Sequence, residues 1–314
     1  MQVVHLHYPI SLQRVAKSPV ALAMGFFDGV HRGHQAVIQR AKQEAEYRKL
    51  PLAVLTYDKF PGMVYESIPG RFHYLTTLDR KVELLDQLGV DVVYVMDFTS
   101  HLGALRPQAF VDEILLKLHV KVVVAGFDHT YGDHQVATME RLAGFAQGRF
   151  EVVTVDKFTG ESTEKISSTA IRQAIDDGQV EVANDSLGYR YQTHGVVVHG
   201  FACGRTIGFP TANVQWDINE RIPAVGVYAV RFKVNQTWYQ GMASVGYNVT
   251  FGDDHEKTIE VFLFDFNDQI YGEHVTVEWV QRLRGEIKFD GVEGLVDQLH
   301  QDETHSRQIL DAIE

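Results

Sequence analysis

Two histidines, His31 and His34, lie three residues apart in the segment Gly-Phe-Phe-Asp-Gly-Val-His-Arg-Gly-His, residues 25–34. The apolar run Val20–Met24 precedes them, and the helical pattern Gln35–Leu50 follows. The order is typical of a strand, a glycine-bearing turn and a helix, with both imidazoles at the helix N-terminus. Backbone N–H groups at that end attract anions, which favours a receptor for nucleotide phosphates. The alternative is that the histidines only cap the helix or stay solvated.

Glycines separate the side chains of this segment. A side chain at Gly25, Gly29 or Gly33 would stand between the backbone and a phosphate, so glycine there favours close approach. Phe27 and Asp28 belong to the same turn, and we expect them to contribute to ATP binding. Asp28 stands beside a glycine, so it is also typical of a residue that caps or orients the turn.

The bulk composition is that of an ordinary globular protein. The 314 residues are 45% hydrophobic and 22% charged, a length that favours two compact units. The formal charge of −12 argues against a general nucleic-acid binder. One cysteine excludes an intrachain disulfide and suits a cytoplasmic protein. No secretory signal is apparent and no apolar run is long enough to cross a bilayer, so no membrane partner is expected.

The first half of the chain alternates between strand-like and helix-like segments, which predicts an α/β domain with a doubly wound parallel sheet. In such sheets ligands bind beyond the carboxyl ends of the strands. The expected strands are Val20–Met24, Leu52–Thr56, Val90–Met96, Val120–Ala125 and Phe150–Val155. The expected helices are Gln35–Leu50, Leu78–Leu88, Arg106–Leu118 and Thr138–Gln147.

The second half has closely spaced strand patterns with little helix between them, which predicts a mainly-β antiparallel barrel. The tail, residues 292–313, is typical of a terminal helix or two, and residues 179–187 of a helical connection. The expected strands are Tyr191–Val198, Val227–Val234, Thr237–Ala243, Thr258–Phe266 and His274–Val280.

Known motifs occur in both halves. Residues 25–34 resemble the HxGH signature of nucleotidyltransferases, and residues 204–213, Gly-Arg-Thr-Ile-Gly-Phe-Pro-Thr-Ala-Asn, resemble the glycine-rich flap and PTAN motif of riboflavin kinases. This order is that of the prokaryotic bifunctional riboflavin kinase/FAD synthetase family. Further segments that resemble the family, in the same order, are 166–172, 226–228, 259–266 and 284–289.

The resemblance implies two activities. An FMN adenylyltransferase (FAD synthetase) domain is expected at residues 1–186 and a riboflavin kinase domain at residues 187–314. The partners would be riboflavin, FMN, FAD, ATP with its product ADP, and pyrophosphate. ATP would be the co-substrate and Mg²⁺ the metal. The sequence does not indicate an oligomeric state.

In the adenylyltransferase half, the resemblance assigns His31 and His34 to catalysis. It assigns a triphosphate-binding motif to Ser167, Ser168, Thr169 and Arg172, although a capped helix with a surface arginine has the same pattern. Asp128 belongs to segment 126–132, which resembles the part of the family that lines the adenine and phosphate region. His129 replaces the usual aromatic residue there, and Asp133–Ala137 lacks the usual glycine.

In the kinase half, the resemblance makes Thr211 and Asn213 the Mg²⁺ ligands and Glu260 the catalytic base. The alternative for Glu260 is a solvent-facing position on a polar strand face. The resemblance places a flap over ATP and a contact region for flavin. The flap residues are Gly200, Gly204, Arg205 and Gly208, and the flavin residues are Arg284, Glu286 and Phe289.

Other functions remain open at this point. A nucleotidyltransferase with another phosphorylated substrate is disfavoured by the kinase-like second half. An aminoacyl-tRNA synthetase is disfavoured because no KMSKS-like lysine motif is obvious. A riboflavin kinase with a weak or inactive adenylyltransferase half, or a flavin-binding regulatory protein, is compatible with the pattern.

Overall fold

The computed structural model describes residues 1–157, 166–200, 203–247 and 257–313. The chain forms two compact units, Met1–Ser168 and Thr169–Glu314. The boundary that the sequence motifs predict, after residue 186, lies further along the chain. Residues 169–186 therefore group with the second unit by their contacts and with the first half by their motif, and the boundary after residue 186 stays a prediction.

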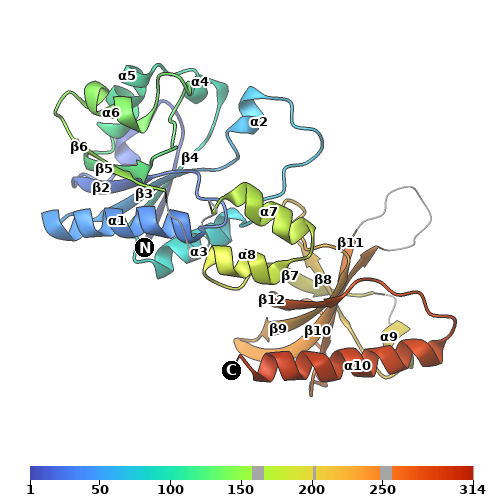
Figure 1. The fold of residues 1–314 in the computed structure, drawn as a ribbon. Coiled ribbons are helices and arrows are strands. Elements are labelled where there is room, and N and C mark those ends of the chain that lie inside the picture. The colour runs from blue at the N-terminus through green and yellow to red at the C-terminus, as the bar shows by residue number, and fades with distance from the viewer. Residues whose placement is uncertain (158–165, 201–202, 248–256, 314) are drawn as a thin grey trace. The chain divides into compact units, whose positions relative to one another are not determined.

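The first unit contains a six-stranded parallel sheet in the order β1-β4-β3-β2-β5-β6 (Figure 1), which confirms the predicted α/β fold. Edge strand β1 was not predicted, because only Val4 and Leu6 of its residues are buried. The strands are β1 Gln2–Leu6, β2 Val20–Met24, β3 Leu52–Tyr57, β4 Val92–Met96, β5 Val120–Gly126 and β6 Glu151–Val155.

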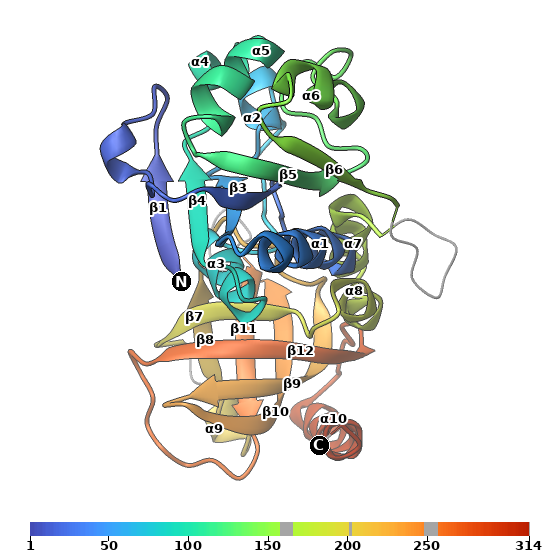
Figure 2. The ribbon, with the colours of Figure 1, turned by 90° about the vertical axis from the view of Figure 1, so that its left-hand side faces the viewer.

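Helices cover both faces of this sheet (Figure 2). One face carries α4, α5 and α6, where Leu22 and Met24 of β2 share a core with Phe110 and Leu142. The other face carries α1 and α3. The helices are α1 Arg32–Arg48, α2 Gly62–Tyr65, α3 Leu78–Gln87, α4 Ser100–Gly103, α5 Pro107–Phe110 and α6 Met139–Ala146, with a 3-10 turn at Leu12–Arg14 and a π-helical turn at Val111–Leu115 after α5.

The connections reverse direction between β2 and β5. From β2 the chain continues to β3 and β4 on one side, and it then returns to β5 and β6 on the other side. Since β2 and β5 are paired neighbours, the loops that follow them flank a topological switch point. Residues 25–31 and 127–132 are these two loops, so the sheet places both predicted segments at the usual ligand position.

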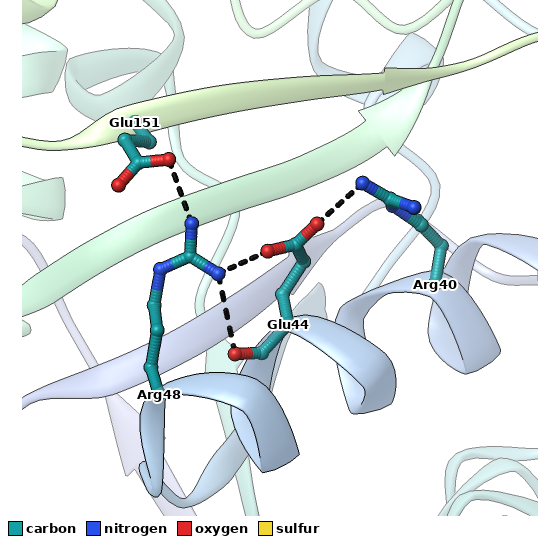
Figure 3. A network of polar contacts seen from close by, with 4 residues as sticks. All are labelled: Arg40, Glu44, Arg48 and Glu151. Carbon is teal, nitrogen blue, oxygen red and sulfur yellow. Dashed lines mark hydrogen bonds and ion pairs between the residues drawn. The ribbon is translucent and has the colours of Figure 1, made fainter.

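A charged network attaches α1 to β6 (Figure 3). The carboxylate of Glu44 accepts hydrogen bonds from Arg40 and Arg48, one turn away on either side. Arg48 also donates to Glu151 of β6 over 2.6 Å. Glu44 is only 8% exposed, so its charge depends on these partners. The network thus fixes the helix whose first turn contains His34.

The second unit contains a closed antiparallel barrel of six strands in the order β10-β11-β8-β7-β12-β9, which confirms the predicted barrel. Strand β8 was not predicted, because only Ala212 and Val214 of its five residues are buried. The strands are β7 Gln192–Val198, β8 Ala212–Trp216, β9 Gly226–Val234, β10 Thr237–Tyr247, β11 Lys257–Leu263 and β12 His274–Arg284.

Helices pack on the outside of this barrel. The tail forms one helix, α10 Val292–Asp311, whose Leu310 is buried in a core with Phe209 and Met242. The other helices of this unit are α7 Ser168–Asp176, α8 Val180–Leu187 and the single turn α9 Cys203–Thr206. In the described parts of the chain, no helix combines the length and apolarity needed to span a bilayer.

Candidate functional site

His31 and His34 form a pair at the start of α1. His31 is the N-cap residue, and its Nδ1 accepts the backbone N–H of His34 over 3.3 Å. The two rings stack with centroids 3.6 Å apart. An Nδ1 that accepts places the proton of a neutral imidazole on Nε2, so His31 presents an N–H donor at its other nitrogen. The predicted capping alternative is therefore present at His31.

The turn before this pair has an unusual backbone. Phe27 and Val30 have positive φ angles of 55° and 38°, which side chains other than glycine rarely adopt, and Gly29 has a φ of 81°. A Cβ added at Gly25 would lie 2.8 Å from the Phe27 ring, so a larger residue there would displace this ring. Phe27 contacts His34 edge-to-face at 5.3 Å. The turn therefore depends on its contacts with the rest of the unit.

Asp28 supplies several of these contacts. Its buried carboxylate accepts the backbone N–H groups of Leu75, over 3.0 Å, and Thr76, over 3.2 Å. Gly29 N–H donates to Thr76 Oγ1 over 3.0 Å. Ser168 Oγ donates to the carbonyl of Asp28 over 2.9 Å. These bonds orient the turn. The capping role, which the neighbouring Gly29 favours in the sequence, stays a prediction.

Two further residues bind this turn and were not predicted from the sequence. The carbonyl of Phe26 accepts hydrogen bonds from Thr56 Oγ1, over 2.8 Å, and from Lys81 Nζ, over 2.9 Å. Lys81 belongs to α3 and is 3% exposed. A lysine inside an amphipathic helix gives no sequence signal of burial, which explains the omission.

The loop after β5 places Asp128 and His129 next to each other. Asp128 is exposed, whereas the His129 ring is half-buried. Loss of hydration lowers the pKa of His129 to about 4, although the charge of Asp128 opposes the shift. The imidazole is therefore neutral at pH 7. Tyr131, further along the loop, packs on Phe110 with centroids 5.2 Å apart.

The predicted serine and arginine motif begins α7. Ser167 precedes the helix, and Ser168 is its first residue, in the first unit. Thr169 and Arg172 lie on α7 in the second unit, where Ile171 is the buried residue of that turn. Helix α7 therefore contains Ser168, Thr169 and Arg172 of this motif.

The barrel brings Thr211, Asn213 and Glu260 together. Thr211 Oγ1 donates to Glu260 Oε2 over 3.0 Å, and Asn213 of β8 is the register partner of Glu260 on β11. All three are half-buried. Hydroxyl, amide and carboxylate oxygens are the hard ligands that Mg²⁺ prefers. Among the described residues, no group of three or more His, Cys, Asp or Glu side chains could hold a metal ion. Glu260 is half-buried and accepts a hydrogen bond from Thr211, so its carboxylate has a fixed partner on a partly exposed strand face.

Glycines of the predicted flap lie against this group. A Cβ added at Gly200 would lie 2.3 Å from the amide nitrogen of Asn213. A Cβ added at Gly204 would lie 2.2 Å from the carbonyl oxygen of Phe209, whose N–H donates to the Gly204 carbonyl. Arg205 is exposed, and Gly208 has a φ of 87°. The chain therefore folds closely over the approach to Thr211.

The predicted flavin residues differ in their surroundings. The guanidinium of Arg284 binds Asp302 of α10, with Nη2 2.7 Å and Nε 3.0 Å from Oδ2. Asp302 is 4% exposed and was not predicted. Glu286 is exposed, and Phe289 is half-buried. The structure thus gives Arg284 an anchoring contact with the terminal helix.

Comparison with known families matches both units. A family model described as FAD synthetase matches residues 13–170, and one described as riboflavin kinase matches residues 187–310. A solved structure from Streptococcus pneumoniae, described as a macrolide-efflux protein, is similar with a TM-score of 0.89 and 39% identity. That match covers 97% of this chain and 99% of the other.

Curated relatives carry one consistent name. A bifunctional riboflavin kinase/FMN adenylyltransferase of Listeria monocytogenes is 50% identical over 314 residues, which is 100% of both chains. The protein of that name from Bacillus subtilis is 41% identical over 96% of both chains. The chain therefore belongs to the bifunctional riboflavin kinase/FMN adenylyltransferase family.

Proposed function

We propose that this chain phosphorylates riboflavin to FMN with ATP and then adenylylates FMN to FAD with a second ATP. The observation that supports this assignment is a cluster of candidate residues in each unit. A histidine pair caps a helix at the switch point of the sheet, and a Thr–Asn–Glu group lies on two paired barrel strands. Family membership gives the same two activities.

In the kinase step, Glu260 takes the proton of the ribityl 5′-hydroxyl as that oxygen attacks the γ-phosphorus of ATP. The new O–P bond forms while the bond to the β-phosphate oxygen breaks, and ADP leaves. Thr211 orients the carboxylate through its hydrogen bond. Thr211 and Asn213 would hold Mg²⁺, which neutralises phosphate charge when bound. The flap residues Gly200, Gly204, Arg205 and Gly208 would cover the phosphates.

The flavin would lie near residues 284–289. Phe289 would contact the isoalloxazine ring, and Glu286 would bind a polar edge. Arg284 would act through its position, because Asp302 already binds its guanidinium. Of the three residues that the resemblance assigns to flavin binding, only Glu286 and Phe289 would then contact the flavin directly.

In the adenylyl step, a phosphate oxygen of FMN attacks the α-phosphorus of ATP, and pyrophosphate leaves. The reaction needs in-line placement and neutralised charge, without a covalent enzyme intermediate. His31 Nε2–H and His34 would donate to the phosphates. The glycines of the turn would admit the phosphates, while Phe27 and Asp28 shape it. The triphosphate motif proposed from the family resemblance consists of Ser167, Ser168, Thr169 and Arg172, and Asp128 would line the adenine and phosphate region.

We also propose that the protein works in the cytoplasm, where ATP is supplied and a single cysteine stays reduced. The test of the whole assignment is a chromatographic time course with riboflavin, ATP and Mg²⁺. FMN that appears first and FAD that follows would support both steps. FMN that accumulates without FAD would indicate a kinase with an inactive adenylyltransferase half, and it would direct attention to His129. A folded sample that makes neither product would favour a flavin-binding regulatory protein.

A further inference from the structure

Lys81 is a buried cation at the phosphate-binding turn. Its ammonium donates to the Phe26 carbonyl over 2.9 Å and lies 4.3 Å from the centroid of the Phe26 ring. The residue is 3% exposed. Burial of a charge opposes folding unless strong partners offset it, and an apolar side chain of similar length would fill the space at less cost. The charge therefore calls for an explanation other than stability.

The partner of Lys81 is the residue that begins the turn. Phe26 directly precedes Phe27, the first of the two non-glycine residues of this turn that have positive φ. The Phe26 carbonyl accepts from Thr56 of β3 as well as from Lys81 of α3. Two donors from two elements fix the direction of this peptide, and the strained turn then leads to the cap residue His31. Lys81 is thus connected by this hydrogen bond to the turn that leads to His31.

The charge of Lys81 is only partly balanced by its surroundings. Asp28 and Asp58 are the carboxylates that face it, but neither forms an ion pair with Lys81. The carboxylate of Asp28 is engaged by the N–H groups of residues 75 and 76, and that of Asp58 by the N–H of Phe98 and by Lys59. Among the described residues, no carboxylate forms an ion pair with Lys81, so its charge is available to an anionic ligand of the turn.

The protonation of Lys81 falls in an accessible range. Burial lowers its pKa to about 8, against the opposing charges of Asp28 and Asp58. The Tyr74 ring contacts the same Phe26 ring, with centroids 6.2 Å apart, and burial raises the pKa of Tyr74 above its usual range. Arg80, the next residue on the helix, pairs with Glu83. Lys81 is thus the group of this cluster that would change charge between pH 7 and 9.

We propose that Lys81 is a positioning residue for adenylyl transfer, which fixes the phosphate-binding turn and supplies buried positive charge to the polyphosphate of ATP. The inference rests on the proposed FAD synthesis by the first unit. Bound triphosphate would stabilise the ammonium form, and loss of the proton would remove the attraction. The rate of FAD formation would then decline above pH 8, whereas the rate of riboflavin phosphorylation would not show this decline.

The test compares Lys81→Arg, Lys81→Gln and Lys81→Met with the parent chain. FAD formation from FMN and riboflavin phosphorylation are measured on each sample from pH 6.5 to 9.5. The exposed Lys121→Gln on β5 is the matched control. We expect the glutamine and methionine variants to lose about 100-fold in the kcat/KM of FAD formation at pH 7. The pH profiles of these two variants should lack the decline in rate near pH 8. The arginine variant should regain part of the rate, and its decline should occur at higher pH.

Either of two results would overturn the proposal. One is a rate of FAD formation by Lys81→Gln within threefold of the parent, and the other is a decline in rate near pH 8 that persists in the glutamine and methionine variants. Riboflavin phosphorylation reports the folding of the second unit alone, so circular dichroism and thermal melting accompany it. If a variant is unfolded, the pH profile of the parent chain still tests the proposal. A parent rate of FAD formation that does not decline near pH 8 would contradict the role of the charge. A parent chain that makes no FAD at any pH would instead refute the proposed function itself.

Discussion

Thr211 donates its hydroxyl hydrogen bond to Glu260 over 3.0 Å, so a predicted metal ligand and the predicted base are in direct contact. The bond links the loop before β8 to β11, and Asn213 completes the group as the register partner of Glu260. A carboxylate held by a hydroxyl has a fixed direction, which general-base catalysis requires. The kinase group is therefore assembled by strand pairing.

Replacement of Glu260 by glutamine should abolish FMN formation and spare FAD formation from supplied FMN. The amide keeps the size and the contact with Thr211, but it cannot take a proton. We expect FMN formation to fall by about 1000-fold. The control is Glu273→Gln, the same change at an exposed position of the barrel unit. Loss of both products in a folded Glu260→Gln protein would refute the assignment of separate sites.

At His31, two substitutions separate the cap from the donor. His31→Ala removes both the Nδ1 acceptor and the Nε2 donor, and His31→Asn keeps a side chain that caps helices well. We expect both variants to lose about 100-fold in FAD formation, with riboflavin phosphorylation unchanged. The melting temperature should recover in the asparagine variant only. Exposed His101→Ala serves as the control, and a His31→Asn enzyme with a normal FAD rate would show that the residue only caps the helix.

The sequence predicted much of the fold because the buried segments have strong patterns. Strands β2 and β3 are buried at every residue, and their valine- and leucine-rich runs are unmistakable. Strands β1 and β8 were missed because each is short and only alternately buried. The sheet order and the barrel closure depend on pairings between distant segments, which periodicity does not report.

The sequence predicted part of the site through motifs and missed the residues that support it. His31, Thr211 and Glu260 stand in recognisable strings. Lys81 and Asp302 do not, because their partners Phe26 and Arg284 are distant in sequence. A side chain whose partner is distant in the sequence forms no local motif, so the sequence alone does not identify it.

Asp302 should be needed for both the barrel unit and the flavin step. It is a buried carboxylate that binds Arg284 through two nitrogens, so Asp302→Ala leaves a guanidinium without its anion. We expect a loss of about 3 kcal/mol in the free energy of unfolding and a raised KM for riboflavin. The exposed Asp297→Asn on the same helix is the control for denaturant melts and kinetics. An unchanged KM for riboflavin would show that the contact between Asp302 and Arg284 contributes to stability but not to flavin binding.

Glu44 should matter for the first unit only. Its carboxylate bridges Arg40 and Arg48, and Arg48 reaches Glu151 on β6. We expect Glu44→Gln to lower the free energy of unfolding by about 1 to 3 kcal/mol, since two cations lose a common anion at a mostly buried site. Urea melts of this variant and of exposed Glu46→Gln give the comparison. Equal stability of the two variants would show that the network adds nothing to the attachment of α1.

The last prediction concerns stability and activity above neutral pH, which Lys81 should move in opposite directions. Its pKa of about 8 in the folded chain lies below the ordinary value of 10.5. Between these values the unfolded chain binds more protons, so the free energy of unfolding rises with pH in this window. The full contribution is present above pH 10.5 and disappears as the pH falls through 8.

Because other groups titrate in the same range, the measured quantity is the difference in unfolding free energy between the parent and Lys81→Gln. We expect this difference to shift in favour of the parent by about 3 kcal/mol from pH 7.5 to 10.5. Over the first part of that range the parent should lose FAD formation. A merely structural lysine would make rate and stability change together. If the two quantities diverge, the ammonium form costs stability and serves the reaction.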